Sequence, residues 1–127
     1  MSKVFLGGTC NGSTWRDEII PKLDCDFFNP VVDDWNEECQ AEEERQKNRE
    51  CDIHLYVITS DMMGVFSIAE AVQSSNDPSC TTVFTVIQDG FSTSQTKSLK
   101  AVSDLVNRNG AYTFHDLDNT TAQLNHI

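Results

Sequence analysis

The chain has 127 residues, with 9 lysine and arginine residues against 20 aspartate and glutamate residues, which gives a net charge of −11. This length suits one domain and is short for two. A chain this acidic repels a phosphate backbone and an anionic membrane surface, so the composition argues against nucleic-acid and membrane partners.

The first residues and the cysteines predict a cytoplasmic protein. The apolar run from Val4 to Gly8 is too short for a signal peptide, and no stretch approaches the ~20 apolar residues that cross a bilayer. Five cysteines are widely spaced without a C-x-x-C pair, which fits neither a disulfide framework nor a zinc site. We therefore expect reduced thiols, and neither a metal nor another cofactor.

Strand and helix patterns alternate along the chain. Short apolar runs predict strands at residues 3–7, 26–29, 51–58, 81–87 and 111–114. Helices are expected to open at 13–18 and to cover 36–50, 65–75 and 96–106. The polar tail, residues 115–127, carries little structural signal and is expected either to fray or to cover the ligand pocket.

The alternation predicts right-handed crossovers and a parallel five-stranded sheet with helices on both faces. Residues 1–127 are thus expected to form one three-layer α/β domain. Such sheets bind ligands at the carboxyl ends of their strands, where the strand order reverses. The loops 7–13, 29–35 and 59–64, which follow the first three strands, are therefore expected to converge on one site.

The first of these loops contains Gly7, Gly8 and Thr9. Its glycines let a ligand approach the backbone closely, or they simply form a tight turn. The spacing matches neither G-x-G-x-x-G nor a Walker loop. Trp15 and Arg16 follow, and they can stack on a base and contact a phosphate or ribose. The alternative is a tryptophan in the core and an arginine on the surface.

Acidic residues fall into two groups. The polar segment 36–50, which includes Glu43 and Lys47, is typical of a solvated helix face with i,i+4 ion pairs. Asp33 and Asp34 lie instead on the expected ligand edge. There, one of them can act in acid–base chemistry or bind a sugar hydroxyl, or an aspartate can cap the next helix.

Glu70 lies in the first turns of the expected helix 65–75, which starts at the ligand edge. The residues expected to face the sheet are Val65, Ile68, Ala69 and Val72. This orientation lets the Glu70 carboxylate reach the crevice at the strand ends. A poorly solvated carboxylate there suits attack on an anomeric carbon or stabilisation of an oxocarbenium ion. The alternative is a surface glutamate on an amphipathic helix.

Five segments together form a pattern that is more specific than any one of them. They are VFLGGT at 4–9, STWR at 13–16, FNPVVDDW at 28–35, CDIHLYVIT at 51–59 and GVFSIAEA at 64–71. In this order and spacing the chain resembles the nucleoside 2-deoxyribosyltransferase-like family over about residues 3 to 90. The resemblance implies a Rossmann-like or flavodoxin-like domain that breaks or exchanges N-glycosidic bonds of deoxynucleosides or nucleotides.

The resemblance also implies roles for single residues. Glu70 matches the family's glutamate nucleophile, in a G-x-x-x-x-x-E arrangement that starts at Gly64. The first glycine loop would hold the sugar or phosphate, and the loop with Asp33 and Asp34 would lie beside the base. The substrate-binding set predicted in this way comprises Gly7, Gly8, Thr9, Trp15, Arg16, Asp33, Gly64 and Ser67.

The general acid departs from the family pattern, in which aspartates ahead of the glutamate position and protonate the leaving base. Asp61 lies nine residues before Glu70, and Gly64 stands close to the usual aspartate position. The candidates for this acid are, in order, Asp34, Asp33 and Asp61.

These inferences predict that a 2′-deoxynucleoside or its 5′-monophosphate binds across the strand ends. Glu70 attacks C1′, and a second base or water completes a retaining transfer or hydrolysis. The alternative is a non-catalytic sensor or sponge that binds a nucleotide or an NAD-derived ligand. The expected partners are this small molecule and a second copy of the chain in a homodimer.

Overall fold

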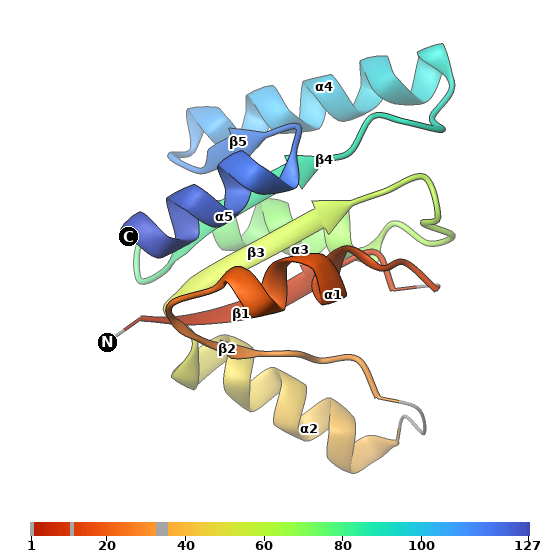
Figure 1. The fold of residues 1–127 in the computed structure, drawn as a ribbon. Coiled ribbons are helices and arrows are strands. Elements are labelled where there is room, and N and C mark those ends of the chain that lie inside the picture. The colour runs from red at the N-terminus through yellow and green to blue at the C-terminus, as the bar shows by residue number, and fades with distance from the viewer. Residues whose placement is uncertain (1, 11, 33–35) are drawn as a thin grey trace.

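The computed structural model describes residues 2–10, 12–32 and 36–127 (Figure 1). Its strands are β1 (Lys3–Gly8), β2 (Asp26–Phe28), β3 (Ile53–Ile58), β4 (Thr81–Val86) and β5 (Tyr112–Phe114). Its helices are α1 (Trp15–Ile19), α2 (Glu37–Arg45), α3 (Phe66–Ser75), α4 (Thr93–Arg108) and α5 (Leu117–His126). A 3-10 turn, η1 (Ile20–Lys22), extends α1, and a π-helical segment, η2 (Gln46–Glu50), extends α2. No helix within the described ranges is long and apolar enough to span a membrane.

The five strands form one parallel sheet in the order β2-β1-β3-β4-β5. This confirms the predicted α/β class and the five-stranded parallel sheet, and the order is that of a flavodoxin-like domain. Since β2 and β3 lie on opposite sides of β1, the strand order reverses between β1 and β3. The register pairs Gly7 with Tyr56 and Gly8 with Val57 at that point.

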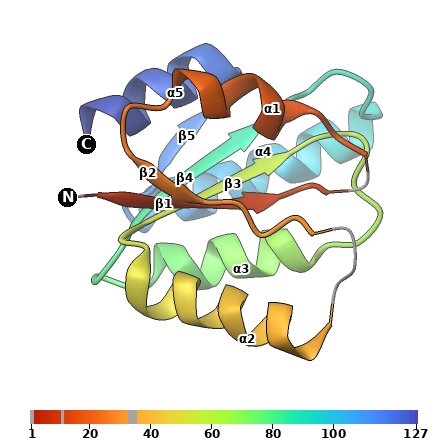
Figure 2. The ribbon, with the colours of Figure 1, turned by 60° about the horizontal axis from the view of Figure 1, so that its bottom comes forward.

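Helices cover both faces of the sheet, which gives the three expected layers (Figure 2). One face packs against α1 and α5 through a cluster that contains Leu6, Leu55 and Leu124. The other packs against α3 and α4 through Phe84 and Leu99, among others. The described parts of the loops that follow β1, β2 and β3 lie at one end of the sheet, on the right of Figure 2.

The expectation for the tail was wrong, because residues 117–126 form the regular helix α5. Asp116 caps it by accepting a hydrogen bond from the backbone N–H of Asn119. Leu124 is buried in the core, and Thr120 is buried on the sheet, where its hydroxyl bonds that of Thr85 at 2.6 Å. The helix therefore completes the α1 face of the core, on the side of the sheet opposite α3, rather than covering a pocket.

The expected buried face of α3 was also displaced. Val65 is 69% exposed, whereas Ala71 and Ser74 are buried and Ile68 and Val72 pack at the edge of the core. Ala69 is exposed as well, so the buried face is turned toward the small side chains of Ala71, Ser74 and Ser75. α4, in contrast, starts three residues earlier than expected, where Ser92 and Gln95 form a capping box.

Candidate active site

A cavity of about 440 Å³ opens at the carboxyl end of β1, between α2 and α3. Its floor is the end of β1, and one wall is formed by Pro30 to Val32 after β2. The remaining walls come from the inner side of α2 and the first turns of α3. A smaller cavity of about 170 Å³ adjoins it under the loop after β3, and the two share Gly8, Cys10, Phe66 and Ser67. This volume and position are those of a small-molecule site at a topological switch point.

The glycines of β1 are required by close packing at this floor. A Cβ on Gly7 would lie 2.7 Å from Cε1 of Tyr56, so the tyrosine ring occupies the space of a side chain. Gly8 has a φ of +118°, and a Cβ there would overlap the backbone of Val57. Both glycines therefore let β1 and β3 close tightly beneath the cavity.

Thr9 joins the two strand ends at the switch point. Its backbone N–H donates to the Val57 carbonyl at 2.9 Å, and its Oγ1 accepts from the Thr59 N–H at 3.0 Å. The side chain is buried, and the residue lines the smaller cavity. Thr9 thus holds the loops after β1 and β3 together.

Trp15 confirms the alternative interpretation, a tryptophan in the core, whereas Arg16 is not on the surface as that alternative expected. Trp15 is buried in the core, does not line the cavity, and donates its Nε1–H to the Thr9 carbonyl. Arg16 is buried too, although it lines the cavity. Its guanidinium stacks on Trp15 at 4.2 Å and donates to the carbonyls of Leu6, Gly8 and Thr9. Burial lowers the pKa of Arg16. Most of its N–H groups are therefore occupied in shaping the first loop.

Glu70 lies on the cavity wall, as its place on α3 predicted. Its Oε2 forms an ion pair at 2.8 Å with the Nζ of Lys47 from the π-helical segment η2. The two side chains are only 10% and 13% exposed, respectively. An ion pair so poorly solvated is strong in Coulombic terms and fixes both groups in place. It presents an oriented carboxylate to the cavity.

The backbone of Lys47 is held by a second buried contact. Its carbonyl accepts from Nε2 of His54, so the other ring nitrogen, Nδ1, accepts from the Ser74 hydroxyl. Ser74 in turn bonds Thr82 at 2.6 Å. Burial lowers the pKa of His54, so the neutral ring is the form that supports this arrangement. Lys47 is thus held in two ways: its side chain pairs with Glu70 of α3, and its carbonyl binds His54, which in turn binds Ser74 of α3. These contacts hold η2 against α3.

Tyr56 lies beneath the same walls. It is fully buried, and the described residues offer its hydroxyl no hydrogen-bond partner. Burial raises the pKa of Tyr56, and the negative charges of Glu70 and Glu43 raise it further. The hydroxyl is therefore a buried donor in the neighbourhood of two cavity carboxylates.

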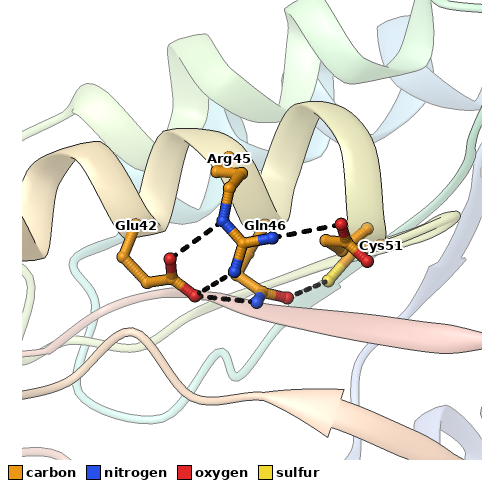
Figure 3. A network of polar contacts seen from close by, with 5 residues as sticks. Glu42, Arg45, Gln46 and Cys51 are labelled. Carbon is orange, nitrogen blue, oxygen red and sulfur yellow. Dashed lines mark hydrogen bonds and ion pairs between the residues drawn. The ribbon is translucent and has the colours of Figure 1, made fainter.

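The helix α2 stands apart from the sheet, since none of its residues is buried. On the side that leads to the start of β3, Glu42 binds Arg45 at 2.6 Å and also accepts from Gln46, as Figure 3 shows. Gln46 is buried and contacts the Cys51 thiol, so this network ties the end of the helix to the start of β3. The inner side of α2 faces the cavity with Glu43 and Glu44.

The structure brings together most of the predicted site residues. Gly7, Gly8, Arg16, Ser67 and Glu70 line the larger cavity. Gly64 and Thr9 line the smaller one. Asp61 is exposed on the loop after β3 and lines neither cavity. Asp33 and Asp34, the first two candidates for the general acid, lie outside the described residues.

Sequence analysis missed Lys47 and Glu43, which it placed on a solvated face. A usable signal was present: the spacing of Gln40, Glu43 and Lys47 puts three polar side chains on one side of a helix that an α/β layer turns toward the sheet. A helix without an apolar face in that layer faces a cavity or water instead of a core.

Strand order and cavity together define a flavodoxin-like α/β domain with an ion-paired carboxylate, Glu70, on the wall of a cavity at the switch point. The family model described as nucleoside 2-deoxyribosyltransferase like matches residues 1–90. The chain belongs to this family, which confirms the resemblance found in the sequence. None of the curated proteins matches the chain.

Proposed function

We propose that the protein cleaves the N-glycosidic bond of 2′-deoxynucleosides or their 5′-monophosphates through a covalent deoxyribosyl intermediate on Glu70. The observation that carries the proposal is the Glu70 carboxylate, ion-paired with Lys47 on the wall of a cavity of about 440 Å³. That volume suits a ligand of nucleoside size. Family membership supports the same class of chemistry.

The reaction has two steps. An oxygen of Glu70 attacks C1′, the C1′–N bond breaks, and its electron pair leaves with the base, which takes a proton from an acid. A second base or a water molecule then attacks C1′, and the bond to Glu70 breaks. Two inversions give overall retention at C1′. Lys47 keeps the carboxylate oriented and stabilises its charge between turnovers.

Incubation with mixed 2′-deoxynucleosides and free bases, read by chromatography, tests the proposal. We expect base exchange or base release by the native chain. Glu70→Gln should abolish both while ligand-induced thermal shifts persist, because the amide keeps the shape but is not a nucleophile. The control is Glu38→Gln, an exposed change on α2 away from the cavity. Equal turnover by the native chain and Glu70→Gln would refute the role of Glu70.

A non-catalytic binding module for a nucleotide or an NAD-derived ligand is the second candidate. The observation that favours it is the position of Asp61, which lines neither cavity and leaves that candidate acid away from Glu70. The same incubation separates the two: tight retention of unchanged ligand by the native chain indicates a binder, and new products indicate an enzyme.

A further inference from the structure

Exposed apolar side chains gather at the carboxyl end of the sheet. Within the described residues, nine large apolar side chains are exposed, and five of them lie on the loops after β2 and β3 or at the start of α3. These five are Val31, Val32, Met63, Val65 and Phe66. All of them except Val65 line one of the two adjoining cavities. Apolar side chains that are exposed around a concave site mark a surface that a ligand covers.

Phe66 is the member of this group that lines both cavities. It is the first residue of α3, and it is 71% exposed. In the part of the chain that the structure describes, it belongs to neither apolar cluster of the core. Packing of the fold therefore does not explain an aromatic ring at this position, which leaves apolar surface in water.

The spacing along α3 places Phe66 beside Glu70. The two residues are four apart, so they lie on one face of the helix, about 6 Å from each other along its axis. Both line the larger cavity. Phe66 is at the start of the helix, which Figure 2 shows at the end of the sheet where the strands finish. A ligand that contacts Glu70 therefore meets Phe66 one helical turn away.

The direction of attack carries the base of a nucleoside toward this ring. A carboxylate that displaces a base approaches C1′ from the side opposite the C1′–N bond, so the base lies beyond C1′ on the line of attack. Helical side chains lean toward the N-terminus of their helix, which for Glu70 is the end that carries Phe66. A sugar held over Glu70 thus extends its base along α3 toward Phe66.

A second apolar surface faces the same cavity from the segment after β2. Val31 and Val32 line it, and both are exposed. The base of a nucleoside is planar, with apolar faces and a polar edge, so its faces match an aromatic ring and aliphatic side chains. The charged part of the cavity, with Lys47 and Glu70, suits the hydroxyl groups of the sugar instead.

We propose that Phe66 is the stacking platform for the nucleobase and that it favours purine over pyrimidine 2′-deoxynucleosides, an assignment that rests on the proposed function. The ring covers one face of the base while Glu70 reacts at C1′. A two-ring purine overlaps the phenyl ring over a larger area than a one-ring pyrimidine does, so it gains more from stacking. Phe66 is a binding residue, and it takes no part in proton transfer or bond breaking.

Equilibrium binding separates this role from catalysis. Dissociation constants for 2′-deoxyinosine and 2′-deoxyuridine are measured by calorimetry in a Glu70→Gln background, where the ligands stay intact. Phe66→Ala removes the ring and Phe66→Tyr keeps it. Val65→Ala is the matched control, because it trims the preceding side chain, which is similarly exposed and lines neither cavity. Circular dichroism and sedimentation velocity follow the fold and the oligomeric state of each variant.

We expect Phe66→Ala to raise Kd for 2′-deoxyinosine by about tenfold or more, the loss typical of a base–aromatic stack. Kd for 2′-deoxyuridine should rise by a smaller factor. Phe66→Tyr and Val65→Ala should stay within about threefold of the background chain for both ligands. With Glu70 restored, Phe66→Ala should raise KM and keep kcat within about threefold of native, because stacking acts alike on bound substrate and transition state.

Three results would overturn the role of Phe66: no loss of affinity in Phe66→Ala, an equal loss in Val65→Ala, or a loss that accompanies a changed oligomeric state. Equal losses for the two ligands would overturn the purine preference. The proposed function fails separately. If the native chain binds 2′-deoxyinosine and forms no product, the covalent chemistry is refuted, while an affinity loss in Phe66→Ala still supports the platform. No binding of either nucleoside by the native chain would overturn both.

Discussion

Helices α2 and α4 are both polar in sequence, yet they are held in the molecule by different forces. α4 buries Leu99 and Val106 against the sheet and has a capping box at its start. α2 buries nothing and is attached mainly at its end, through the Gln46 network and the ion pair of Lys47. The comparison teaches that α4 stabilises the fold, while α2 forms a polar wall for the site.

The strongest test of this difference is truncation of an apolar contact of α4. Leu99→Ala should lower the free energy of unfolding by about 2–5 kcal/mol, because it leaves a cavity in the core. An exposed change on α2, Glu38→Ala, should stay within about 0.5 kcal/mol. Urea denaturation measures both values. Similar losses in the two helices would contradict the distinction between them.

The next largest effect on the free energy of unfolding comes from breaking the Lys47–Glu70 ion pair, which attaches η2 to α3. Lys47→Met leaves the poorly solvated Glu70 carboxylate without its cation and should cost about 1–3 kcal/mol, below the range for fully buried pairs because some exposure remains. Adding Glu70→Gln should recover part of the loss, which a double-mutant cycle in urea quantifies. Strictly additive losses would show that the pair contributes no coupling.

His54, which binds the Lys47 carbonyl, makes the stability of the protein depend on pH. Burial lowers the pKa of His54, so the unfolded chain binds its proton at higher pH than the folded chain. Stability should therefore fall as pH decreases below about 6.5, the ordinary histidine value, toward the lower value of the folded state. His54→Gln should flatten this fall in urea midpoints measured between about pH 7.5 and 5.5. The exposed change His126→Gln is the control and should retain it.

The smallest effect on stability concerns the buried Tyr56 hydroxyl, which has no hydrogen-bond partner among the residues that the structure describes. Tyr56→Phe should leave stability unchanged or raise it by up to about 1 kcal/mol, because a buried hydroxyl without a partner is costly. Thermal denaturation measures the change. A clear loss of stability would show that the hydroxyl has a hydrogen-bond partner in solution.

Much of the fold could be predicted from sequence, because each buried strand is a short apolar run between turn residues. α5 could not, since two of the side chains that it buries are the threonines Thr120 and Thr121. Glu70 could be placed beside the crevice from topology together with the helix pattern of residues 65–75 and the family resemblance. Lys47 and Glu43 could not, because a polar helix face has the same pattern whether it meets water or a ligand cavity.

A covalent intermediate on Glu70 is the central claim, and peptide mass spectrometry after rapid acid quench tests it most directly. The native chain, mixed with 2′-deoxyinosine and no acceptor base, should carry one deoxyribosyl group on the peptide that contains Glu70. Glu70→Gln should carry none. Product formation by the native chain with no adduct at any quench time, or with an adduct on another residue, would contradict the account.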